Sequence, residues 1–370
     1  MKKDKAQSIL IIGPFPNPIS GVSLANKVVK EALDASPFFE TQIIDTSYSE
    51  FEEDLGVFSL KKTLFYLKIN FKIYKIFRNN IIYITPGQTF FGVAKYSLFI
   101  ILSSLLKKEL IVHVHGNYLK TEYETLKGKK KQVFKFLISK FSKGIVLSNS
   151  LRKNLTPFLE EKMIYVLPNF AQSFLMSEKK AENNTLKIIY LSNLMKEKGI
   201  FALLDSLKEM ENNGVRYEAK IAGNIDQKYL EEIQKKVSNL SHVTYLGIVK
   251  GEKKKELLNW GTVFVLPTYY SMEGQPISII EAMATENVII TTNHAGIPDI
   301  IKDKINGFFV QKNNESDLTN QLTSLSENLQ VVEKIAKENK KYFLENFTEE
   351  KFKERLIKIV TEHVPKFREI

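Results

Sequence analysis

Two glutamates, Glu273 and Glu281, are separated by seven residues, with Gly274 and Pro276 between them. The pattern predicts a loop that leads into a helix containing Glu281. A helix N-terminus presents unpaired N–H groups and the positive end of the helix dipole, which suits a diphosphate. A carboxylate on the following turns accepts hydrogen bonds from ribose hydroxyls, as acidic residues do in dinucleotide sites. A surface loop followed by an exposed helix glutamate fits the same spacing, so the spacing alone leaves both interpretations open.

Several further features follow the two glutamates in order along the chain. They are Glu-Ala-Met at 281–283, a strand pattern at 288–291, Gly-Ile-Pro-Asp at 296–299 and a turn with Asn-Gly-Phe at 306–308. Together they resemble the signature of glycosyltransferase family 4, whose members are retaining enzymes of the GT-B fold. The resemblance implies that Glu281 holds the donor ribose and that Glu273 contacts the donor sugar and acts in catalysis. It also implies donor contacts from the residues between them, Gly274, Gln275, Pro276 and Ile277.

Two segments of the first half resemble the same family. The loop 16–22 is similar to the glycine loop that approaches donor and acceptor, with Gly21 where many members have paired glycines. Glycine lets backbone come close to a ligand, although an ordinary turn also uses it. His113 and His115 end a predicted strand, and alternation places both side chains on one face. The resemblance implies a functional, catalytic histidine at His115.

The segment 191–199 resembles the family's strand-to-helix turn, where a basic pair grips the donor diphosphate. Lys198 fits the second cation, and the resemblance assigns it a role in catalysis and donor binding. The first cation, arginine in most members, is Asn193 here, which is assigned to donor binding by position. Asparagine donates hydrogen bonds but carries no charge, so the predicted neutralisation of the diphosphate is weaker. A solvated helix lysine is the alternative interpretation of Lys198.

Two other positions depart from the family pattern. Pro276 removes one backbone N–H that a glycine would offer to phosphate, and Glu286 stands where glycine is common. The sequence has no Asp-x-Asp triplet and no cluster of His and carboxylates at metal-ligand spacing. We therefore expect no metal and no other cofactor. The helix N-terminus and Lys198 would stabilise the leaving nucleoside diphosphate electrostatically.

The elements that position these residues alternate between short apolar strands and helical stretches. Strand patterns of the first half occur at 8–12, 41–44, 81–85, 110–115, 144–147 and 163–167, with a helix pattern at 22–33. The series restarts after the polar stretch 177–185, with strands at 186–191, 217–222, 243–246, 262–266 and 288–291. Continuous apolar runs separated by helices predict parallel sheets that are covered on both faces.

Two such series predict an α/β protein of GT-B architecture, with two doubly wound, Rossmann-like domains facing across a cleft. We expect an N-terminal, acceptor-binding domain at residues 1–170 and a C-terminal, nucleotide-sugar donor domain at 171–345. A C-terminal helix within residues 346–370 is expected to pack back towards the first domain. The length of 370 residues also favours two domains over one.

The composition excludes several classes of protein. With 44% hydrophobic and 26% charged residues, the chain is expected to be globular rather than disordered. The absence of cysteine excludes disulfides, thiolate metal sites and thiol nucleophiles, and it suits the cytoplasm. The apolar run after the basic N-terminus is too short for a signal peptide. The apolar stretch 93–106 is too short to span a bilayer and predicts a buried helix.

The net charge of +11 implies an anionic partner. Within residues 61–78, one helical stripe carries Lys61, Lys68, Lys72, Lys75 and Arg78, and a second basic cluster lies at 127–143. Basic amphipathic helices of this kind bind anionic membrane surfaces. A core-packed helix with a solvated lysine stripe fits the same pattern. No nucleic-acid-binding motif accompanies the charge, so we expect no nucleic-acid partner.

The sequence therefore predicts a cytoplasmic glycosyltransferase that moves a sugar from a nucleotide-sugar, with UDP-sugars favoured, to a saccharide or lipid-linked saccharide. A peripheral position at the inner face of the plasma membrane is the accompanying hypothesis. Bacterial relatives of this kind often build surface polysaccharides, so capsule, O-antigen or exopolysaccharide assembly is expected. Two alternatives stay open: a non-enzymatic sugar-nucleotide-binding protein, which the neutral Asn193 favours, and a sugar-nucleotide epimerase of the same fold.

Overall fold

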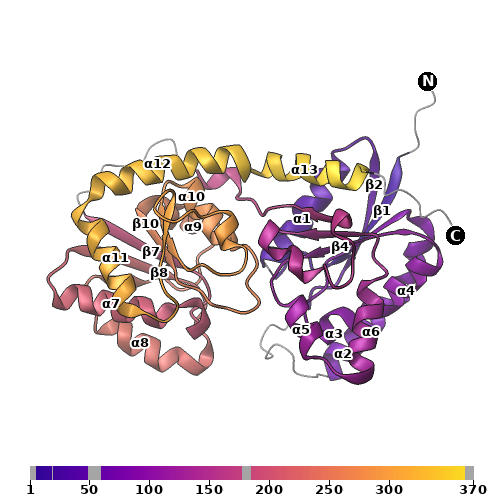
Figure 1. The fold of residues 1–370 in the computed structure, drawn as a ribbon, viewed down its shortest axis with the longest axis horizontal. Coiled ribbons are helices and arrows are strands. Elements are labelled where there is room, and N and C mark those ends of the chain that lie inside the picture. Colours follow the sequence, from indigo (N-terminus) through magenta and orange to yellow (C-terminus); the bar gives the residue numbers. More distant parts are fainter. Residues whose placement is uncertain (1–5, 19, 49–59, 177–184, 363–370) are drawn as a thin grey trace. The chain divides into compact units, whose positions relative to one another are not determined.

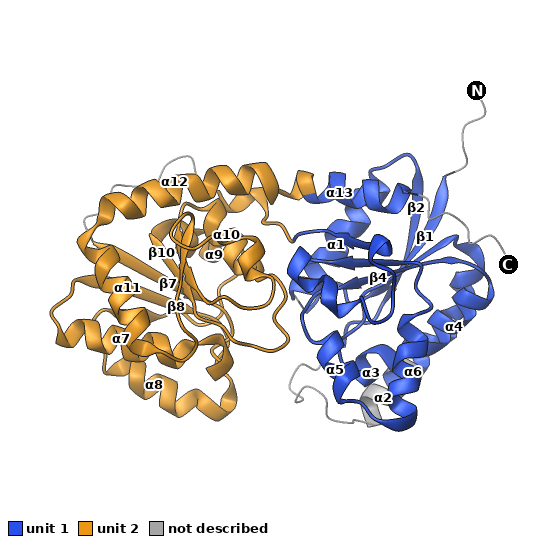
Figure 2. Cartoon of the chain, viewed as in Figure 1, with its two compact units in different colours: residues 1–168, 352–370 blue, residues 169–351 orange. Residues whose placement is uncertain are grey.

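The computed structural model of the chain describes residues 6–18, 20–48, 60–176 and 185–362. The chain divides into two compact units, which Figure 2 shows in different colours. Unit 1 contains residues 1–168 and 352–370, and unit 2 contains residues 169–351. Each unit is an α/β structure on a six-stranded parallel sheet with helices on its faces (Figure 1).

The strands of unit 1 run parallel in the order β2-β1-β3-β4-β5-β6. They are β1 (Gln7–Gly13), β2 (Phe39–Asp45), β3 (Ile81–Ile84), β4 (Glu109–Val114), β5 (Lys143–Val146) and β6 (Ile164–Val166). Strands β3 and β5 are buried along their whole length, as a parallel sheet between helices requires. The direction of strand addition reverses between β1 and β3, which makes this the topological switch point of unit 1.

All helices of unit 1 except the last connect these strands. The α-helices are α1 (Gly21–Asp34), α2 (Leu60–Asn70), α3 (Phe90–Ala94), α4 (Ser97–Leu105), α5 (Leu119–Thr125), α6 (Gly128–Ile138) and α13 (Glu349–Thr361), most of which belongs to this unit. The 3-10 helices are η1 (Phe71–Arg78), η2 (Asn149–Asn154) and η3 (Glu161–Met163). Helix α1 begins with a capping box, in which Ser20 and Ser23 satisfy each other's backbone N–H groups.

The strands of unit 2 run parallel in the order β12-β11-β10-β7-β8-β9. They are β7 (Leu186–Leu191), β8 (Tyr217–Ala222), β9 (Val243–Tyr245), β10 (Val263–Leu266), β11 (Val288–Thr291) and β12 (Gly307–Phe309). Counted from β7, this is the strand order of the dinucleotide-binding Rossmann fold. The switch point of unit 2 therefore lies between β7 and β10.

The helices of unit 2 enclose its sheet (Figure 1). They are α7 (Ile200–Asn212), α8 (Leu230–Ser238), α9 (Gly251–Trp260), α10 (Ile277–Ala284), α11 (Glu315–Glu327) and α12 (Leu329–Asn346), with the 3-10 helices η4 (Ser173–Leu175), η5 (Lys196–Lys198), η6 (Gln227–Tyr229) and η7 (Ile297–Asp299). Their apolar faces pack on fully buried strand residues such as Ile189, Phe264 and Ile290, and form one continuous core.

The structure confirms the α/β class and each strand that the sequence predicts, with end points that differ by two residues at most. The turn expected at 306–308 is wrong in part, because Gly307–Phe309 forms β12 and pairs with β11. A side chain at Gly307 would meet the Ile289 carbonyl oxygen at 2.7 Å, so the close pairing of these strands needs glycine there. Most of the predicted linker 177–185 lies outside the described residues.

Two helix predictions for unit 1 need correction. The single buried helix expected at 93–106 is wrong, because α3 and α4 are separate and α4 exposes Leu98 and Leu105. The helix expected at 61–78 is α2 followed by the 3-10 helix η1, so its lysines do not form one α-helical stripe. The side chain of Lys61 lies outside the described part of the chain. Among the described residues, no helix combines the length and apolar content that crossing a bilayer requires.

Candidate functional site

The site predicted from the glutamates lies at the switch point of unit 2. The segment with Asn193 and Lys198 follows the carboxyl end of β7, and the segment with Glu273 follows the carboxyl end of β10. Strands β7 and β10 are neighbours in the sheet. Ligands of open α/β sheets bind outside the carboxyl ends of the strands at this point, so the topology brings the predicted residues to the expected place.

The two switch-point segments are held together by close backbone contacts. Gly199 has φ +81°, and a side chain there would meet the Pro267 ring at 2.5 Å, so both the conformation and the contact need glycine. The Tyr269 N–H donates to the Glu197 carbonyl oxygen at 2.8 Å, and the Thr268 hydroxyl donates to the same oxygen at 3.3 Å. The segment after β7 and the segment after β10 are therefore joined by hydrogen bonds and by close backbone packing.

Lys198 and Glu273 form an ion pair across these segments. The Lys198 Nζ atom lies 2.5 Å from Glu273 Oε2. The Thr268 hydroxyl, whose single proton is shared between this oxygen and the Glu197 carbonyl oxygen, lies 3.3 Å from both. Both side chains are largely buried, with 14% and 10% of their surface exposed. The Lys198 ammonium also lies 5.0 Å from the centre of the Tyr270 ring. The structure thus brings together two of the three residues predicted to be catalytic, with the cation fixed in place.

Glu281 lies on α10 and pairs with Lys254, which comes from α9. The Lys254 Nζ atom is 2.5 Å from Glu281 Oε1, and only 5% of the Glu281 side chain is exposed. Burial raises the pKa of the Glu281 carboxyl above its ordinary value, and the Lys254 charge and hydrogen bond oppose that rise. The alternative interpretation of the sequence, an exposed glutamate on the helix surface, is therefore wrong. Glu281 is a buried carboxylate whose charge is supported by one lysine.

The loop before α10 is ordered by backbone and amide contacts. Asn169 donates from its backbone N–H to Gln275 Oε1 at 2.7 Å and from its side chain to the Gln275 carbonyl oxygen at 2.8 Å. The Gly296 N–H donates to the Gly274 carbonyl oxygen at 2.9 Å. Pro276 caps the N-terminus of α10 without a side-chain hydrogen bond, and Ile277 is its first residue. The first turn of α10 therefore keeps N–H groups without helical partners.

Asn193 is exposed on the segment that follows β7. Its carbonyl oxygen accepts a hydrogen bond from the Tyr190 hydroxyl at 3.1 Å, and the Lys198 carbonyl oxygen accepts from the same hydroxyl at 3.4 Å. Tyr190 is buried under the segment and ties its two ends together. The position of Asn193 matches the first cation of the family pattern, but the side chain supplies no positive charge.

The predicted residues of unit 1 lie near the carboxyl ends of β1 and β4. Gly21 is the first, exposed residue of α1, directly after the cap Ser20. His115 follows β4 directly, and His113 lies within that strand. All other predicted site residues belong to unit 2.

The His113 and His115 rings lie side by side and are tilted by 39°, on one face as the strand alternation predicts. Their ring centres are 3.9 Å apart, and the Tyr83 hydroxyl lies 2.6 Å from His113 Nδ1. The Nε2 atoms of both histidines are buried and have no hydrogen-bond partner among the described residues. Burial lowers the pKa of His115 to about 3, and it lowers the pKa of His113, to which the neighbouring His115 also contributes. Both rings are therefore neutral near pH 7.

Two residues that contact the predicted site residues or their neighbours are not predicted by any pattern in the sequence. Lys254 stands in a run of three lysines on α9 that reads as a solvated surface, yet its side chain is 19% exposed and reaches Glu281. Tyr83 reads as one more apolar strand residue, and burial raises the pKa of its hydroxyl. The only indication for each residue is its position in the fold. Tyr83 lies on β3, the neighbour of β4, and Lys254 lies on α9, which precedes β10 and α10 in the chain.

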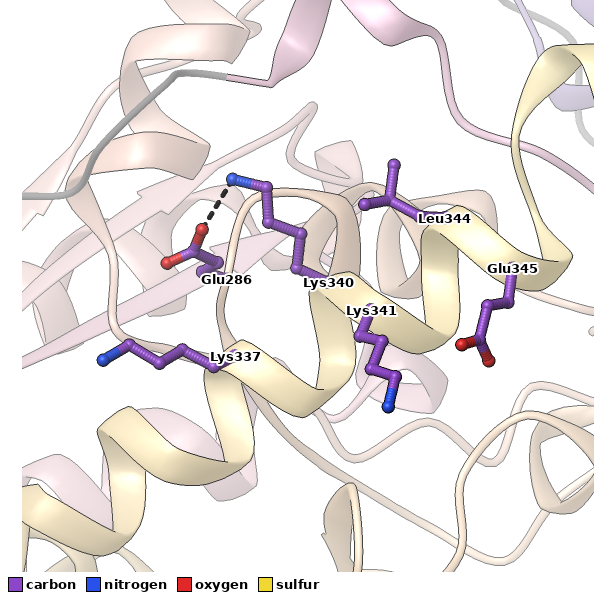
Figure 3. A pocket seen from close by; sticks show the side chains of 6 residues that line it. All are labelled: Glu286, Lys337, Lys340, Lys341, Leu344 and Glu345. Carbon is purple, nitrogen blue, oxygen red and sulfur yellow. Dashed lines mark hydrogen bonds and ion pairs between the residues drawn. The ribbon is translucent and has the colours of Figure 1, made fainter.

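A surface pocket of about 400 Å³ lies elsewhere on unit 2 (Figure 3). It is lined by five residues of α12 together with Glu286, and Lys340 Nζ lies 2.6 Å from Glu286 Oε1. Glu286 has φ +54°, the left-handed conformation that explains why glycine is common at this position. None of the predicted donor residues lines this pocket, so it does not belong to the switch-point site.

Among the residues that the structure describes, no group of three or more His, Asp or Glu side chains is placed to hold a metal ion. Metal independence stays a prediction of the sequence. The positive charge that the site offers comes from Lys198, Lys254 and the first turn of α10. This arrangement suits an anionic ligand with hydroxyl groups.

The sequence of the chain is similar to those of known glycosyltransferases. Residues 172–342 match the model of the family described as "Glycosyl transferases group 1". An uncharacterized glycosyltransferase of Methanocaldococcus jannaschii, MJ1178, is 26% identical over 256 residues, which cover 68% of this chain and 68% of that relative. The putative colanic acid biosynthesis glycosyltransferase WcaL of Escherichia coli is 26% identical over 162 residues. That match covers 40% of this chain and only 38% of WcaL.

Solved structures share the fold over almost the whole chain. Alr3699/HepE of Anabaena, solved in complex with UDP, superposes with a TM-score of 0.73 at 14% identity and covers 96% of this chain and 100% of its own. Its complex with UDP-glucose gives a TM-score of 0.72. The similarity shows that both units have the GT-B type of fold.

Proposed function

We propose that the chain, whose residues 172–342 match the model of the group 1 glycosyl transferases, moves a sugar from a nucleotide-sugar donor to a saccharide or lipid-linked saccharide. The observation that carries this proposal is the pair of carboxylates at the switch point. Glu273 and Glu281 stand on the segment after β10, each paired with a lysine. Such a place and such charges suit the ribose, diphosphate and sugar of a donor.

Glu281 is the proposed partner of the donor ribose. An ionised carboxylate accepts hydrogen bonds from two neighbouring hydroxyls. Burial favours the neutral form of Glu281, and Lys254 opposes that effect. Lys254 is therefore proposed to keep the Glu281 carboxylate ready to accept these hydrogen bonds.

Lys198 is proposed to stabilise the leaving nucleoside diphosphate. Its Nζ atom is held by Glu273, which prevents the lysine side chain from sampling many orientations. A fixed cation and the unpaired N–H groups of the α10 first turn act where negative charge develops, without reorganisation during the reaction. Glu273 in turn is proposed to contact the donor sugar.

We propose a retaining, front-face reaction. The acceptor hydroxyl oxygen forms a bond to the anomeric carbon on the face that the diphosphate leaves. The bond between that carbon and the phosphate oxygen breaks, and its electron pair goes to the diphosphate. The hydroxyl proton passes to the departing phosphate oxygen. Neutral His115 is proposed to donate a hydrogen bond near this reaction without adding charge.

The donor and acceptor are proposed from the chemistry of relatives. UDP-sugars are the favoured donors, supported by the UDP and UDP-glucose complexes of the similar Alr3699/HepE structures. The similar WcaL protein is named for colanic acid biosynthesis, which supports assembly of a bacterial surface polysaccharide, in a capsule or elsewhere. We propose that no metal takes part and that the enzyme works in the cytoplasm, at the inner face of the plasma membrane.

The test incubates purified protein with UDP-sugars and saccharide acceptors and follows UDP release and the product by NMR. An α-linked product from an α-linked donor supports the proposal, and a β-linked product rejects the retaining step. Release of UDP without a new glycosidic bond would favour a hydrolase. Donor binding without any turnover would favour the sugar-nucleotide-binding protein, and recovery of an isomerised donor would favour the epimerase.

A further inference from the structure

The outer surface of five elements in unit 1, α2, η1, α3, α4 and α6, has an unusual composition. These elements contain ten Lys and Arg residues and no Asp or Glu. The chain as a whole has 53 Lys and Arg against 42 Asp and Glu, so the imbalance is concentrated here. We call this surface the crossover surface, because its elements belong to three successive crossover connections.

The topology places these elements on one face of the sheet. The connections from β2 to β3, from β3 to β4 and from β4 to β5 all run in the same direction across the strand order, whereas β1 to β2 runs the other way. Because crossovers between parallel strands are right-handed, the first three place their helices on one face and α1 lies on the other. Figure 1 shows α3, α4 and α6 on the side of the sheet away from α1.

Element η1 sorts its side chains into rows. A 3-10 helix has three residues per turn, so residues three apart lie directly above one another. Phe71, Tyr74 and Phe77 form an aromatic row in which the exposed fractions are 81%, 54% and 61%. Lys72, Lys75 and Arg78 form a cationic row beside it. Ile76, on the third row, is fully buried and anchors η1 to the unit.

The neighbouring helices continue this combination of exposed apolar and cationic side chains. Leu64 and Leu67 of α2, Leu98 and Leu105 of α4, Phe91 of α3, and Val133 and Phe136 of α6 are all exposed large apolar residues. Lysines stand over several of the rings. Lys130 Nζ lies 5.7 Å from the centre of the Phe91 ring, and Lys140 Nζ lies 4.5 Å from that of Phe136.

We propose that the crossover surface binds a lipid bilayer that contains anionic lipids. Aromatic and aliphatic side chains enter the boundary between headgroups and acyl chains, and the lysines contact lipid phosphates. Nucleic acid would use the cations but would leave the leucines exposed to water. A second copy of the same surface would bring cations against cations, with no acidic residue in the five elements to offset them. The bilayer alone satisfies both kinds of side chain.

This inference rests on the proposed function, because a lipid-linked acceptor is the reason for the enzyme to bind a membrane. Membrane binding itself is measured without donor or acceptor. The full chain is mixed with vesicles of phosphatidylcholine alone, or with about 30 mol % phosphatidylglycerol, and sedimented at low and high salt. We expect binding to the anionic vesicles only, weakened by salt. Absence of binding to anionic vesicles at low salt would overturn the inference and leave the transfer reaction with soluble acceptors untouched.

Two variants assign the binding to η1. The triple change Phe71→Ser, Tyr74→Ser and Phe77→Ser, and the pair Lys72→Gln and Arg78→Gln, should each weaken vesicle binding by about tenfold or more. Each of these five side chains is exposed. Lys75 is left unchanged because it donates to the Ile43 carbonyl oxygen.

The matched control changes two exposed apolar residues of unit 2, Ile248→Ser and Ile305→Ser, which are 60% and 66% exposed. We expect this control to bind vesicles like the unaltered chain. Equal losses in control and η1 variants would contradict a specific surface. So would light scattering that shows the unaltered chain as a dimer and the aromatic variant as a monomer, because a second copy would then cover the row.

Discussion

At the scale of single residues, the candidate site contains two lysine–carboxylate pairs that connect different elements of unit 2. Lys198 and Glu273 join two loops of the switch point, whereas Lys254 and Glu281 join two helices. A third pair, Lys340 and Glu286, has a similar length of 2.6 Å but lies at the α12 pocket. It serves as an internal control, since its loss removes one ion pair of the same unit without touching the donor residues.

Lys198→Ala should lower kcat/KM for transfer by about a hundredfold, because the leaving diphosphate loses a fixed cation. Lys340→Ala should leave kcat/KM unchanged. Both are measured by UDP release under saturating acceptor. Equal activity of the Lys198→Ala variant and the unaltered chain would show that the lysine only orders the loop.

The Glu281–Lys254 pair predicts a pH dependence. Burial has already raised the pKa of Glu281, and removing the lysine in Lys254→Ala removes the only effect that opposes the rise. Since the ribose hydroxyls need the ionised carboxylate as acceptor, UDP affinity should fall as the pH falls through this pKa. The fall should begin at higher pH in Lys254→Ala than in the unaltered chain. Calorimetric titration across pH 5 to about 8 tests this, and identical profiles would contradict it.

At the scale of elements, one buried lysine links the sheet of unit 1 to its last helix. Lys143, at the start of β5, is fully buried and its Nζ atom lies 2.8 Å from Glu109 Oε1. The same ammonium donates to the carbonyl oxygen of Ile359 at 3.0 Å and to that of Glu362. Carbonyl groups at a helix C-terminus lack helical partners, so a cation is well placed there. This contact holds α13 in unit 1.

Lys143→Met should lower the free energy of unfolding by about 3 kcal/mol, because Glu109 keeps a partly buried charge without its partner. The carbonyl groups at the end of α13 also lose their donor. Urea denaturation followed by circular dichroism measures the change. The exposed pair Lys337 and Glu333 is the control, and Lys337→Met should leave the free energy of unfolding nearly unchanged. Equal costs for the two variants would contradict a structural role of Lys143.

A comparison of the predicted with the observed elements shows which features of the fold the sequence predicts and which it does not. The strands could be predicted because each is a continuous apolar run, and Glu273 and Glu281 because they stand in an ordered motif. Strand β12 was missed, since three residues after a turn signal carry little periodicity. The 3-10 geometry of η1 was also missed, because a spacing of three fits an α-helical stripe almost as well. Lys254 was missed because only the packing of α9 and α10 brings it to Glu281.

At the scale of the whole molecule, the two units carry separate parts of the proposed function. Every proposed diphosphate and ribose contact belongs to unit 2, which has its own core, while His115, Gly21 and the crossover surface belong to unit 1. A ligand that binds only the folded state raises stability by mass action. Donor binding should therefore stabilise unit 2 even in variants of the crossover surface.

A calorimetric titration of UDP and UDP-sugars into the full chain and into Glu281→Ala, with Lys340→Ala as the control, tests the proposed donor site directly. We expect binding by the unaltered chain and by Lys340→Ala, with affinity at least about tenfold weaker in Glu281→Ala because the ribose hydroxyls lose a charged acceptor. Undiminished affinity in a folded Glu281→Ala variant would contradict the placement of the donor at the switch point of unit 2.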